Sequence, residues 1–351
     1  MSVAPVRIGF IGAGGIARQR HLPGLKAIDG IELVAVANRS RASAERIARD
    51  WGFLGPRLRV CDDWRAVIEQ PDVDAVFIGT PPYLHCEATL AALEAGKHVF
   101  CQARLARDYR EALAMYERAR RSDRVTMVCP PPHALAGDFV VQRLLREGLL
   151  GQLLHVAVRG LGQDYADAEA PLHWRQDAFL SGYNTLALGM WFEVLHRWVG
   201  HFASITAQAA YHVPRRRRPG SVQPVEVRIA DSLGIVGTLK NGAIAVLDVS
   251  GSTRFAGSPR IELFGSAGTL VYEVSGDRIL AARTGDAGLE PVPISAEEQR
   301  HWTAEADFIR AIREGTPVSP DFEEGLRYME ATEAVYRAAR SGQTISLPLE
   351  L

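Results

Sequence analysis

The sequence predicts an α/β protein in which a doubly wound parallel sheet is followed by an α+β domain with a large, mostly antiparallel sheet. Up to about residue 130, short apolar runs alternate with helical patterns, as buried parallel strands and their crossover helices do. A glycine-rich turn joins the first apolar run to the first helix. Beyond that point, long segments alternate apolar and polar residues, which is typical of antiparallel strands. The first part is therefore expected to be of the Rossmann type.

The opening strand, residues 7–11, runs directly into the sequence Gly-Ala-Gly-Gly-Ile-Ala. The first glycine of such a turn allows a sharp bend, the second lets the backbone approach a ligand, and the alanine lets the new helix pack on its strand. N–H groups at the start of the helix suit a pyrophosphate. We therefore expect a dinucleotide to bind at Gly12, Gly14, Gly15, Ile16 and Ala17.

The alternation of strand and helix continues through the first part. The predicted strands are residues 31–37, 75–78, 98–100 and 125–128, and the predicted helices are residues 42–50, 86–95 and 110–121. Three consecutive prolines, 130–132, end this pattern. We place the domain boundary there, with a dinucleotide-binding domain over residues 1–131 and a substrate-binding and oligomerisation domain over residues 132–351.

The second domain opens with a predicted helix over residues 138–147 and closes with two more, residues 303–313 and 323–340. A further helix is predicted over residues 183–199. The predicted strands are residues 153–159, 204–211, 225–239 and 243–249, and Asn241-Gly242 is a hairpin signal between the last two.

Composition excludes several classes of function. The 351 residues carry 40 Lys plus Arg against 41 Asp plus Glu and are 47% apolar, so neither disorder nor nucleic-acid binding is expected. No apolar run is long enough to cross a membrane and no leader pattern opens the chain, which favours a cytoplasmic protein. Cys61, Cys86, Cys101 and Cys129 lack zinc spacing, so we expect reduced thiols and no metal.

A basic run, Arg215 to Arg218, lies between prolines and is predicted to be a loop. Two interpretations remain open for it. It is either a solvated loop tip or a clamp for an anionic substrate.

The end of the second predicted strand bears on the choice of cofactor. NAD-binding folds usually carry an acidic residue there, which accepts hydrogen bonds from the adenosine ribose. Here Asn38, Arg39 and Ser40 offer donors and one cation, which suit a 2′-phosphate. NADP(H) is therefore favoured, and NAD(H) remains possible if Arg39 only stacks on the adenine.

The order of motifs resembles the Gfo/Idh/MocA oxidoreductases, which include glucose-fructose oxidoreductase and inositol dehydrogenase. The matching motifs are Gly12-x-Gly14-x-x-Ala17, then Gly79-Thr80-Pro81-Pro82-Tyr83-Leu84-His85, then Ala95-Gly96-Lys97-His98-Val99, and later Trp174-Arg175 and Ser341-Gly342.

The resemblance implies further contacts. It implies that Thr80, Pro81, Pro82 and His85 line the cofactor beside the nicotinamide ribose, with Gln102, Trp174 and Arg175 also near the cofactor. It also implies that the antiparallel sheet forms a homodimer or homotetramer.

The chain departs from this family where protons are handled. The family's catalytic Lys stands in a Glu-Lys-Pro triplet, but this chain reads Gln102-Ala103-Arg104. Alignment on Gly189 places Ala187 where the family has an Asp and Trp191 where it has a His. A positioned acid or base contributes about a hundredfold to ten-thousandfold in rate, so the loss of all three is a large departure.

Other residues are candidates for the lost roles. His133 is the first candidate for acid/base work, because it follows a strand's carboxyl end and titrates near neutral pH. Tyr183 is the second candidate. Arg104 would hold a carboxylate or a carbonyl oxygen, and Asn184 would bond a substrate oxygen.

The helix predicted over residues 183–199 raises further alternatives. It would place Asn184, Ala187 and Trp191 on one face. Trp191 either stacks on substrate or packs in the core, and Asn184 has a possible helix-start role. Glu193 and Arg197 are expected to form a surface pair, and His196 to be structural, near the helix end where a cation suits the dipole.

Taken together, these features predict an enzyme that transfers a hydride to or from a nicotinamide cofactor. The family resemblance implies that the hydride is exchanged with a hydroxyl or carbonyl carbon of a sugar, cyclitol or similar small molecule. One alternative is an enzyme that uses the bound cofactor only transiently, for elimination, glycoside cleavage or epimerisation. The other is a non-catalytic nucleotide-binding protein.

Overall fold

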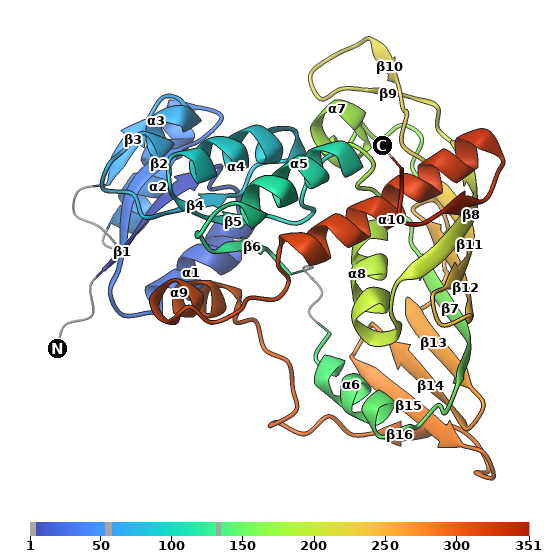
Figure 1. Ribbon diagram of the computed structural model, residues 1–351. Coiled ribbons are helices and arrows are strands. Elements are labelled where there is room, and N and C mark those ends of the chain that lie inside the picture. Colours follow the sequence, from blue (N-terminus) through green and yellow to red (C-terminus); the bar gives the residue numbers. More distant parts are fainter. Residues whose placement is uncertain (1–4, 53–57, 131–134, 351) are drawn as a thin grey trace. The chain divides into compact units, whose positions relative to one another are not determined.

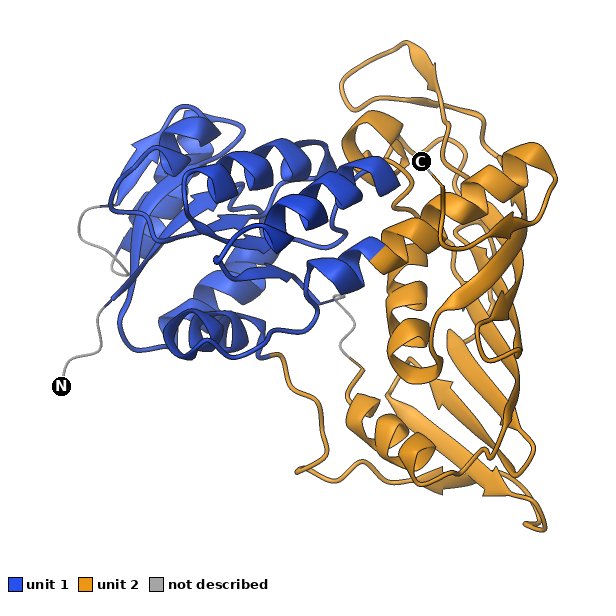
Figure 2. Ribbon diagram, in the orientation of Figure 1, with its two compact units in different colours: residues 1–130, 303–326 blue, residues 131–302, 327–351 orange. Residues whose placement is uncertain are grey.

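The computed structural model describes residues 5–52, 58–130 and 135–350. Its internal contacts divide the chain into two compact units, coloured separately in Figure 2. The first comprises Met1–Pro130 and Thr303–Leu326, and the second comprises Pro131–Trp302 and Arg327–Leu351. The segment 303–326 thus belongs to the first unit although it lies far beyond residue 131 in the sequence.

The first unit is built on a six-stranded parallel sheet, shown in Figure 1. Its strand order is β3-β2-β1-β4-β5-β6, so the order reverses between β1 and β4. In such sheets ligands bind at the carboxyl ends of the strands beside this reversal. The strands are β1 Val6–Ile11, β2 Ile31–Ala37, β3 Arg59–Cys61, β4 Ala75–Ile78, β5 His98–Cys101 and β6 Thr126–Val128.

Helices cover both faces of this sheet (Figure 1). The crossover helices start at side-chain caps where the sequence supplies them: Ser40, Asp63 and Asp108 accept hydrogen bonds from the first turns of α2, α3 and α5. The helical elements are η1 Ala17–His21, α1 Leu22–Lys26, α2 Arg41–Trp51, α3 Trp64–Ile68, η3 Pro82–Leu84, α4 His85–Glu94, α5 Tyr109–Arg120 and α9 Ala304–Glu314.

The core of the first unit is partly aromatic. Phe77 on β4 stacks between Phe10 on β1, at 5.1 Å, and Phe100 on β5, at 4.5 Å between ring centroids. Phe308 on α9 meets both Phe77 and Phe100 edge-on. The segment after α9 also extends the sheet edge, because the Val128 N–H donates to the Pro320 carbonyl at 3.1 Å. Residues 303–326 therefore complete this unit.

The second unit is built on a nine-stranded sheet whose order is β16-β15-β14-β13-β7-β12-β11-β8-β17. Only the β7–β12 pair is parallel among the described strands, so the predicted mostly antiparallel sheet is confirmed. The strands are β7 Leu153–Leu161, β8 Phe202–Ala210, β11 Ser232–Leu239, β12 Ile244–Ser250, β13 Arg260–Gly265, β14 Gly268–Glu273, β15 Arg278–Arg283, β16 Glu290–Val292 and β17 Ile345–Ser346.

One face of this sheet is covered by helices and the other is open (Figure 1). Trp198 on α8 packs against Tyr272 on β14, and the Tyr336 hydroxyl on α10 accepts from the Ala230 N–H. Val236 and Ile244 on the open face are each about half exposed. The helical elements of this unit are α6 Asp138–Arg146, η4 Trp174–Gln176, α7 Ala178–Ser181, α8 Leu188–Val199 and the part of α10 Phe322–Ser341 that begins at residue 327.

One predicted strand of the second unit is wrong. The segment 225–239 forms two strands rather than one: β10 Pro224–Glu226 pairs with β9 Arg215–Arg217 in a separate two-stranded ribbon, and β11 starts at Ser232. Asp231 interrupts the run because its buried carboxylate accepts from the Val213 N–H and from Gln176. The predicted hairpin at Asn241-Gly242 is present, with Gly242 at φ +89° between β11 and β12.

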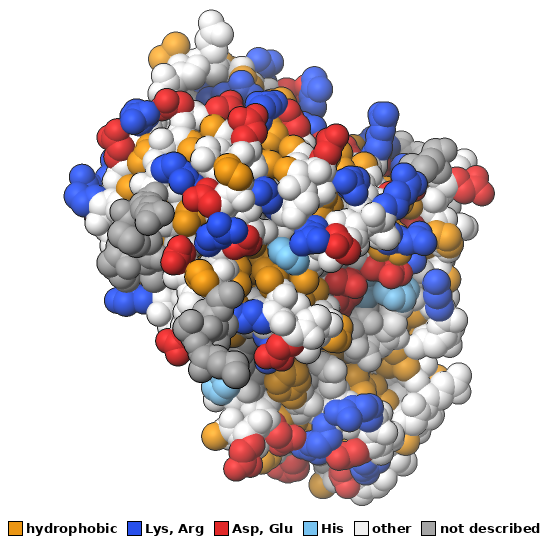
Figure 3. Space-filling view, turned by 60° about the vertical axis from the view of Figure 1, so that its left-hand side comes forward, with side chains coloured by type: hydrophobic (Ala, Val, Ile, Leu, Met, Phe, Trp, Pro, Cys, Tyr) orange, Lys and Arg blue, Asp and Glu red, His pale blue; other side chains and the backbone are white. Residues whose placement is uncertain are grey.

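The surface carries both signs of charge. On the face shown in Figure 3, acidic and basic side chains are interspersed. No helix in the described part of the chain combines the length and the apolar character needed to cross a membrane.

Candidate functional site

The glycine-rich turn has the shape that a dinucleotide needs. Gly12 has φ +84°, and a Cβ placed on it would lie 2.6 Å from the Thr80 Cγ2 atom and 2.8 Å from the Thr80 backbone nitrogen. The turn is closed by the Gly14 N–H, which donates to the Gly12 carbonyl at 2.8 Å. Space is open at Gly15, where an added Cβ would meet no atom within 4 Å. The turn is thus packed on its inner side and free on its outer side.

The helix after this turn offers backbone donors. Residues 15–26 form a continuous helical segment that includes the π-helical turn η1. The first N–H groups of a helix have no partner within it, and the helix dipole favours an anion there. The residues predicted for the diphosphate, Gly12 to Ala17, therefore fit that group.

The Asn38 side chain has a structural contact that the sequence does not reveal. Its Oδ1 atom accepts from the Ala13 N–H at 2.7 Å, so it holds the glycine turn against the end of β2. With this oxygen engaged, the amide presents only N–H donors to a ligand. Ser40 caps α2, and Arg39 is exposed. Their predicted contacts with the adenosine ribose stay predictions.

The segment from Thr80 to His85 follows β4 beside the glycine turn. Pro81 is extended, with φ −61° and ψ 158°, and η3 follows it. His85 is fully buried, and its ring nitrogens face the Thr80 carbonyl at 2.7 Å and the Arg104 carbonyl at 3.1 Å. Burial lowers the pKa of His85 and hydrogen bonds to the backbone oppose the shift. His85 therefore links two strand-end loops, and a cofactor contact from its ring stays a prediction.

The triplet Gln102-Ala103-Arg104 follows β5, the next strand of the sheet. Gln102 is 9% exposed and Arg104 is 5% exposed. The Gln102 Oε1 atom lies 2.8 Å from Nε2 of His21. The side chains predicted as a cofactor contact, Gln102, and as a substrate contact, Arg104, are therefore mostly enclosed within the first unit.

Two buried residues at this strand end were not predicted as site residues. His21, in η1, places its Nδ1 atom 2.5 Å from Oε1 of Glu305 on α9. The spacing Ala17, His21 and Leu25 indicates that His21 lies on the packed face of its helix. Its partner was not predictable, because 284 residues separate the two in sequence.

In the second unit, the Trp174-Arg175 pair forms η4. The Arg175 guanidinium carbon lies 4.3 Å from the centre of the Trp174 ring. Burial lowers the pKa of Arg175, and the Tyr165 hydroxyl opposes that shift. No carboxylate of the described residues is ion-paired with this guanidinium. A partly desolvated cation without a counter-ion is a suitable partner for an anionic group.

The helix predicted over residues 183–199 begins at Leu188, five residues after the predicted start. Gly182 has φ +61°, and both Leu186 and Ala187 have positive φ, so residues 182–187 form a loop and α8 begins at Leu188. Asn184 is buried in this loop, where its amide donates to the Ser181 carbonyl at 2.7 Å. The prediction that Asn184, Ala187 and Trp191 share a helix face is therefore wrong.

Tyr183 lies in the same loop beside a cation. Its hydroxyl accepts from Nη1 of Arg340 at 2.7 Å, and its ring stacks on Tyr336 at 4.4 Å. Because the hydroxyl oxygen accepts, its own proton is available to another group. Tyr183 therefore stays a candidate acid. His133, the first candidate, lies outside the described residues.

Trp191, which alignment on Gly189 predicted to stand at the position of the family's His, is 4% exposed. A Cβ on Gly160 of β7 would lie 2.6 Å from its Nε1 atom, so the strand has a glycine where the indole packs. No acceptor for this Nε1 is found among the described residues. The core-packing interpretation of Trp191 is the one that the geometry favours.

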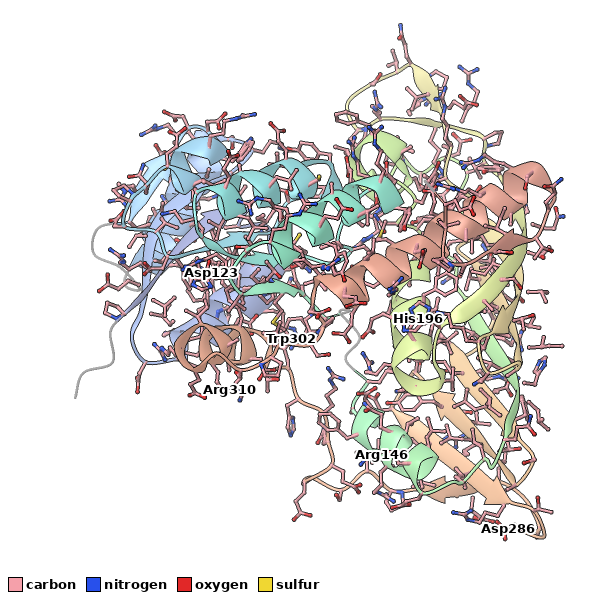
Figure 4. All side chains as sticks on the ribbon, viewed as in Figure 1. Asp123, Arg146, His196, Asp286, Trp302 and Arg310 are labelled. Carbon is pink, nitrogen blue, oxygen red and sulfur yellow. The ribbon has the colours of Figure 1, made fainter. Side chains whose placement is uncertain are left out.

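Two further expectations for α8 are corrected. Glu193 and Arg197 do pair, but Glu193 is 4% exposed, so the pair is buried rather than superficial. His196, labelled in Figure 4, is not a cation at the helix end. Burial lowers its pKa to about 3, and His201, Arg327 and Lys240 add to the shift. A buried imidazole without a carboxylate partner stays neutral.

The prediction for the basic run Arg215 to Arg218 is also corrected. Arg215–Arg217 is strand β9, not a loop. Arg216 is buried and donates to the backbone carbonyls of Tyr165, Asp167 and Ala170 at 2.7–3.0 Å. Neither the solvated tip nor the anion clamp describes Arg216, because its donors hold another segment of the same unit.

The fold and the glycine turn together define a dinucleotide-binding α/β protein. Comparison with family models gives the family. The NAD-binding Rossmann domain of the Gfo/Idh/MocA oxidoreductase family matches residues 6–129, and the C-terminal alpha/beta domain of that family matches residues 142–347. The chain therefore belongs to this family of oxidoreductases.

Several characterised relatives match over nearly the whole chain. Levoglucosan dehydrogenase of Pseudarthrobacter phenanthrenivorans is 27% identical, with 98% of each chain covered. D-glucoside 3-dehydrogenase of Escherichia coli is 25% identical, with 99% of each covered. Among solved structures, levoglucosan dehydrogenase in complex with NADH and L-sorbose superposes with a TM-score of 0.84 at 25% identity, covering 99% of this chain and all of that one.

Proposed function

We propose that the protein is an NADP(H)-linked oxidoreductase that transfers a hydride between the nicotinamide and a hydroxyl or carbonyl carbon of a sugar-like molecule. The observation that carries this proposal is the glycine turn, packed against Thr80 on one side and open at Gly15 on the other. The sugar-like substrate class is supported by relatives that act on levoglucosan and on D-glucosides.

The preference for NADP(H) rests on the end of β2. Because the Asn38 oxygen is engaged with Ala13, only its amide hydrogens face outward. Arg39 beside it is exposed and carries a positive charge. Both suit a 2′-phosphate, whereas an acidic residue would repel one. NAD(H) remains the alternative, and the related levoglucosan dehydrogenase was solved with NADH.

Residues of the chain itself would bind the cofactor and transfer the proton. When bound, the cofactor supplies or accepts the hydride. The helix start at residues 15–17 would hold the diphosphate. The cationic Arg175 side chain would bind an anionic group. For the proton, Tyr183, whose hydroxyl accepts from Arg340, is the candidate among the described residues. His133 remains a candidate from the sequence alone.

Assembly and location complete the proposal. The open face of the second unit's sheet, with Val236 and Ile244 half exposed, would form a homodimer or homotetramer. A cytoplasmic location fits the four cysteines, all of which are free.

The proposal is tested by turnover of a panel of sugars and cyclitols with each coenzyme, followed by mass spectrometry of the products. We expect net oxidation or reduction, stronger with NADP(H). Product formation without change in the reduced-nicotinamide absorbance would instead support transient use of the cofactor. Binding of the coenzyme without any turnover would support a non-catalytic protein.

A further inference from the structure

A buried hydrogen-bonded network lies at the carboxyl end of β5, within the first unit. His21 stands at its centre, with Nδ1 2.5 Å from Glu305 Oε1 and Nε2 2.8 Å from Gln102 Oε1. The side chains of His21 and Glu305 are 2% and 3% exposed. No step of the proposed hydride transfer uses either residue.

The Gln102 amide is oriented toward His21. Its oxygen lies 2.8 Å from Nε2 of His21. The neighbouring Cys129 thiol is buried, and burial raises its pKa, so it stays neutral.

This orientation determines the protonation of His21. An amide oxygen can only accept, so the His21 Nε2 atom must carry a hydrogen. A carboxylate also only accepts, so Nδ1 carries one as well when Glu305 is ionised. His21 and Glu305 are thus buried as a hydrogen-bonded pair, so neither group is left without a partner. A buried charge is tolerated only when it is paired in this way.

The surroundings are shaped to hold the pair. A Cβ on Gly24 would lie 2.6 Å from Glu305 Oε2, so the glycine in α1 makes room for the carboxylate. The His21 ring meets Phe100 edge-on at 5.2 Å and Phe77 at 5.9 Å. The imidazole thus contacts two apolar rings, and each of its nitrogens faces a side-chain oxygen.

Resting on the proposed function, we propose that His21, held by Glu305, is a positioning residue for the nicotinamide half of the cofactor. It ties the helix that follows the glycine turn to the segment Gln102–Arg104, which follows β5. By fixing Gln102, it sets the backbone of that segment. The adenine half, which the end of β2 would hold, does not depend on it.

The test compares binding of the reduced coenzyme with binding of its fragment lacking the nicotinamide base. Calorimetry measures NADPH against 2′-phospho-ADP-ribose, or NADH against ADP-ribose if the wild type prefers NADH. His21→Phe keeps the ring volume and removes both donors. We expect it to weaken coenzyme binding about tenfold and fragment binding less than about threefold. A parallel loss of both ligands would overturn the proposal, because a merely structural role affects both.

Two further variants sharpen this test. Gln102→Met should reproduce the effect of His21→Phe on coenzyme binding, and the double variant should bind no more weakly than the worse single variant, because both changes remove the His21–Gln102 hydrogen bond. Additive losses would contradict the coupling. Glu305→Gln is the conservative control: its amide can donate to Nδ1, which leaves Nε2–H for Gln102. It should stay within about threefold of the wild type.

A spectroscopic measurement covers the case in which His21→Phe does not fold. The ¹⁵N shifts of His21 in the wild type should show a hydrogen on Nε2 at neutral pH, and an unprotonated Nε2 would overturn the proposal. The outcomes are also separable from the proposed function. If the wild type binds neither coenzyme nor fragment, the proposed function fails. If it binds both and His21→Phe does not discriminate between them, only this inference fails.

Discussion

The glycine turn of the first unit and the segment 182–199 of the second illustrate two ways in which a chain reaches an unusual backbone. At Gly12, φ is +84°, and glycine is the residue type that adopts such a φ without steric cost. At Leu186 and Ala187, φ is also positive, but neither residue type favours that region. In the first segment, the glycine pattern itself predicts the turn, whereas in the second no residue type predicts the loop before α8. The backbone conformation of the glycine turn thus follows from its residue types, whereas that of the loop before α8 is set by packing.

The largest effect should come from Gly12→Ala. The new Cβ would lie 2.6 Å from Thr80 Cγ2 at a positive φ, so the free energy of unfolding should fall by about 2 kcal/mol or more. Coenzyme binding, followed by the fluorescence of the reduced nicotinamide, should weaken at least about a hundredfold, a loss of about 3 kcal/mol. Gly15→Ala is the control, with no atom within 4 Å, and should leave the stability unchanged or slightly raised. Equal losses in both variants would refute the packed inner side of the turn.

The second effect concerns Trp191, which packs against Gly160 of β7. Trp191→His leaves unfilled space beside Gly160, and we expect urea denaturation to show a loss of about 3 kcal/mol. Gly160→Ala alone should cost about 1–3 kcal/mol, because its Cβ meets the indole. Combined, the two changes should cost less than their sum. Strict additivity would show that strand and indole are not matched.

The third effect is a pH dependence that originates in His196 on α8. Its pKa is lowered to about 3 by burial, against 6.5 in the unfolded chain. A lowered pKa stabilises the fold fully above the unfolded value, and this stability is lost as the pH falls toward 3. Between pH 7 and pH 5 the loss should be about 2 kcal/mol.

His196→Phe should remove the pH-dependent part of the free energy of unfolding, because phenylalanine does not titrate. It should be accommodated, since Phe192 and Phe202 already contact this position. The measurement is urea denaturation at both pH values, with the exposed His301→Gln as the matched control. A His196→Phe variant with the pH dependence of the wild type would show that the imidazole is already charged in the native state.

The smallest effect should come from the positive φ at Ala187. Ala187→Gly removes a strained conformation and should raise the free energy of unfolding by up to about 1 kcal/mol, partly offset by the freedom of glycine in the unfolded chain. The same change in the first segment, Ala17→Gly, should lower it by about 1 kcal/mol, because Ala17 is helical. Thermal unfolding measures both. Destabilisation by Ala187→Gly would mean that the loop is not strained there.

The features that the sequence predicted correctly are those that local residue types encode, and the features that it missed are set by packing. The parallel order of the first unit and the mostly antiparallel sheet of the second were predictable, because apolar periodicity and glycine placement encode them locally. The start of α8 was not, since Asn184 and Ala187 have no local signal against a helix. Arg216 was misjudged because its acceptors are carbonyls some fifty residues away.

The candidate site was predictable only in part. The glycine turn and the end of β2 were identified by residue type. The network of His21, Gln102 and Glu305 was not, because α9 reaches it from the far end of the sequence. Likewise, no sequence pattern shows that Asn38 holds the Ala13 N–H. Side chains that bridge distant segments are set by tertiary packing, which composition and periodicity do not encode.

Each proposed role for this protein requires that the first unit hold a nicotinamide dinucleotide at its glycine turn. Calorimetric titration of the wild-type protein with NADPH and with NADH tests it most directly. We expect saturable binding of one coenzyme per chain, tighter for NADPH. No heat with either coenzyme, oxidised or reduced, would contradict it.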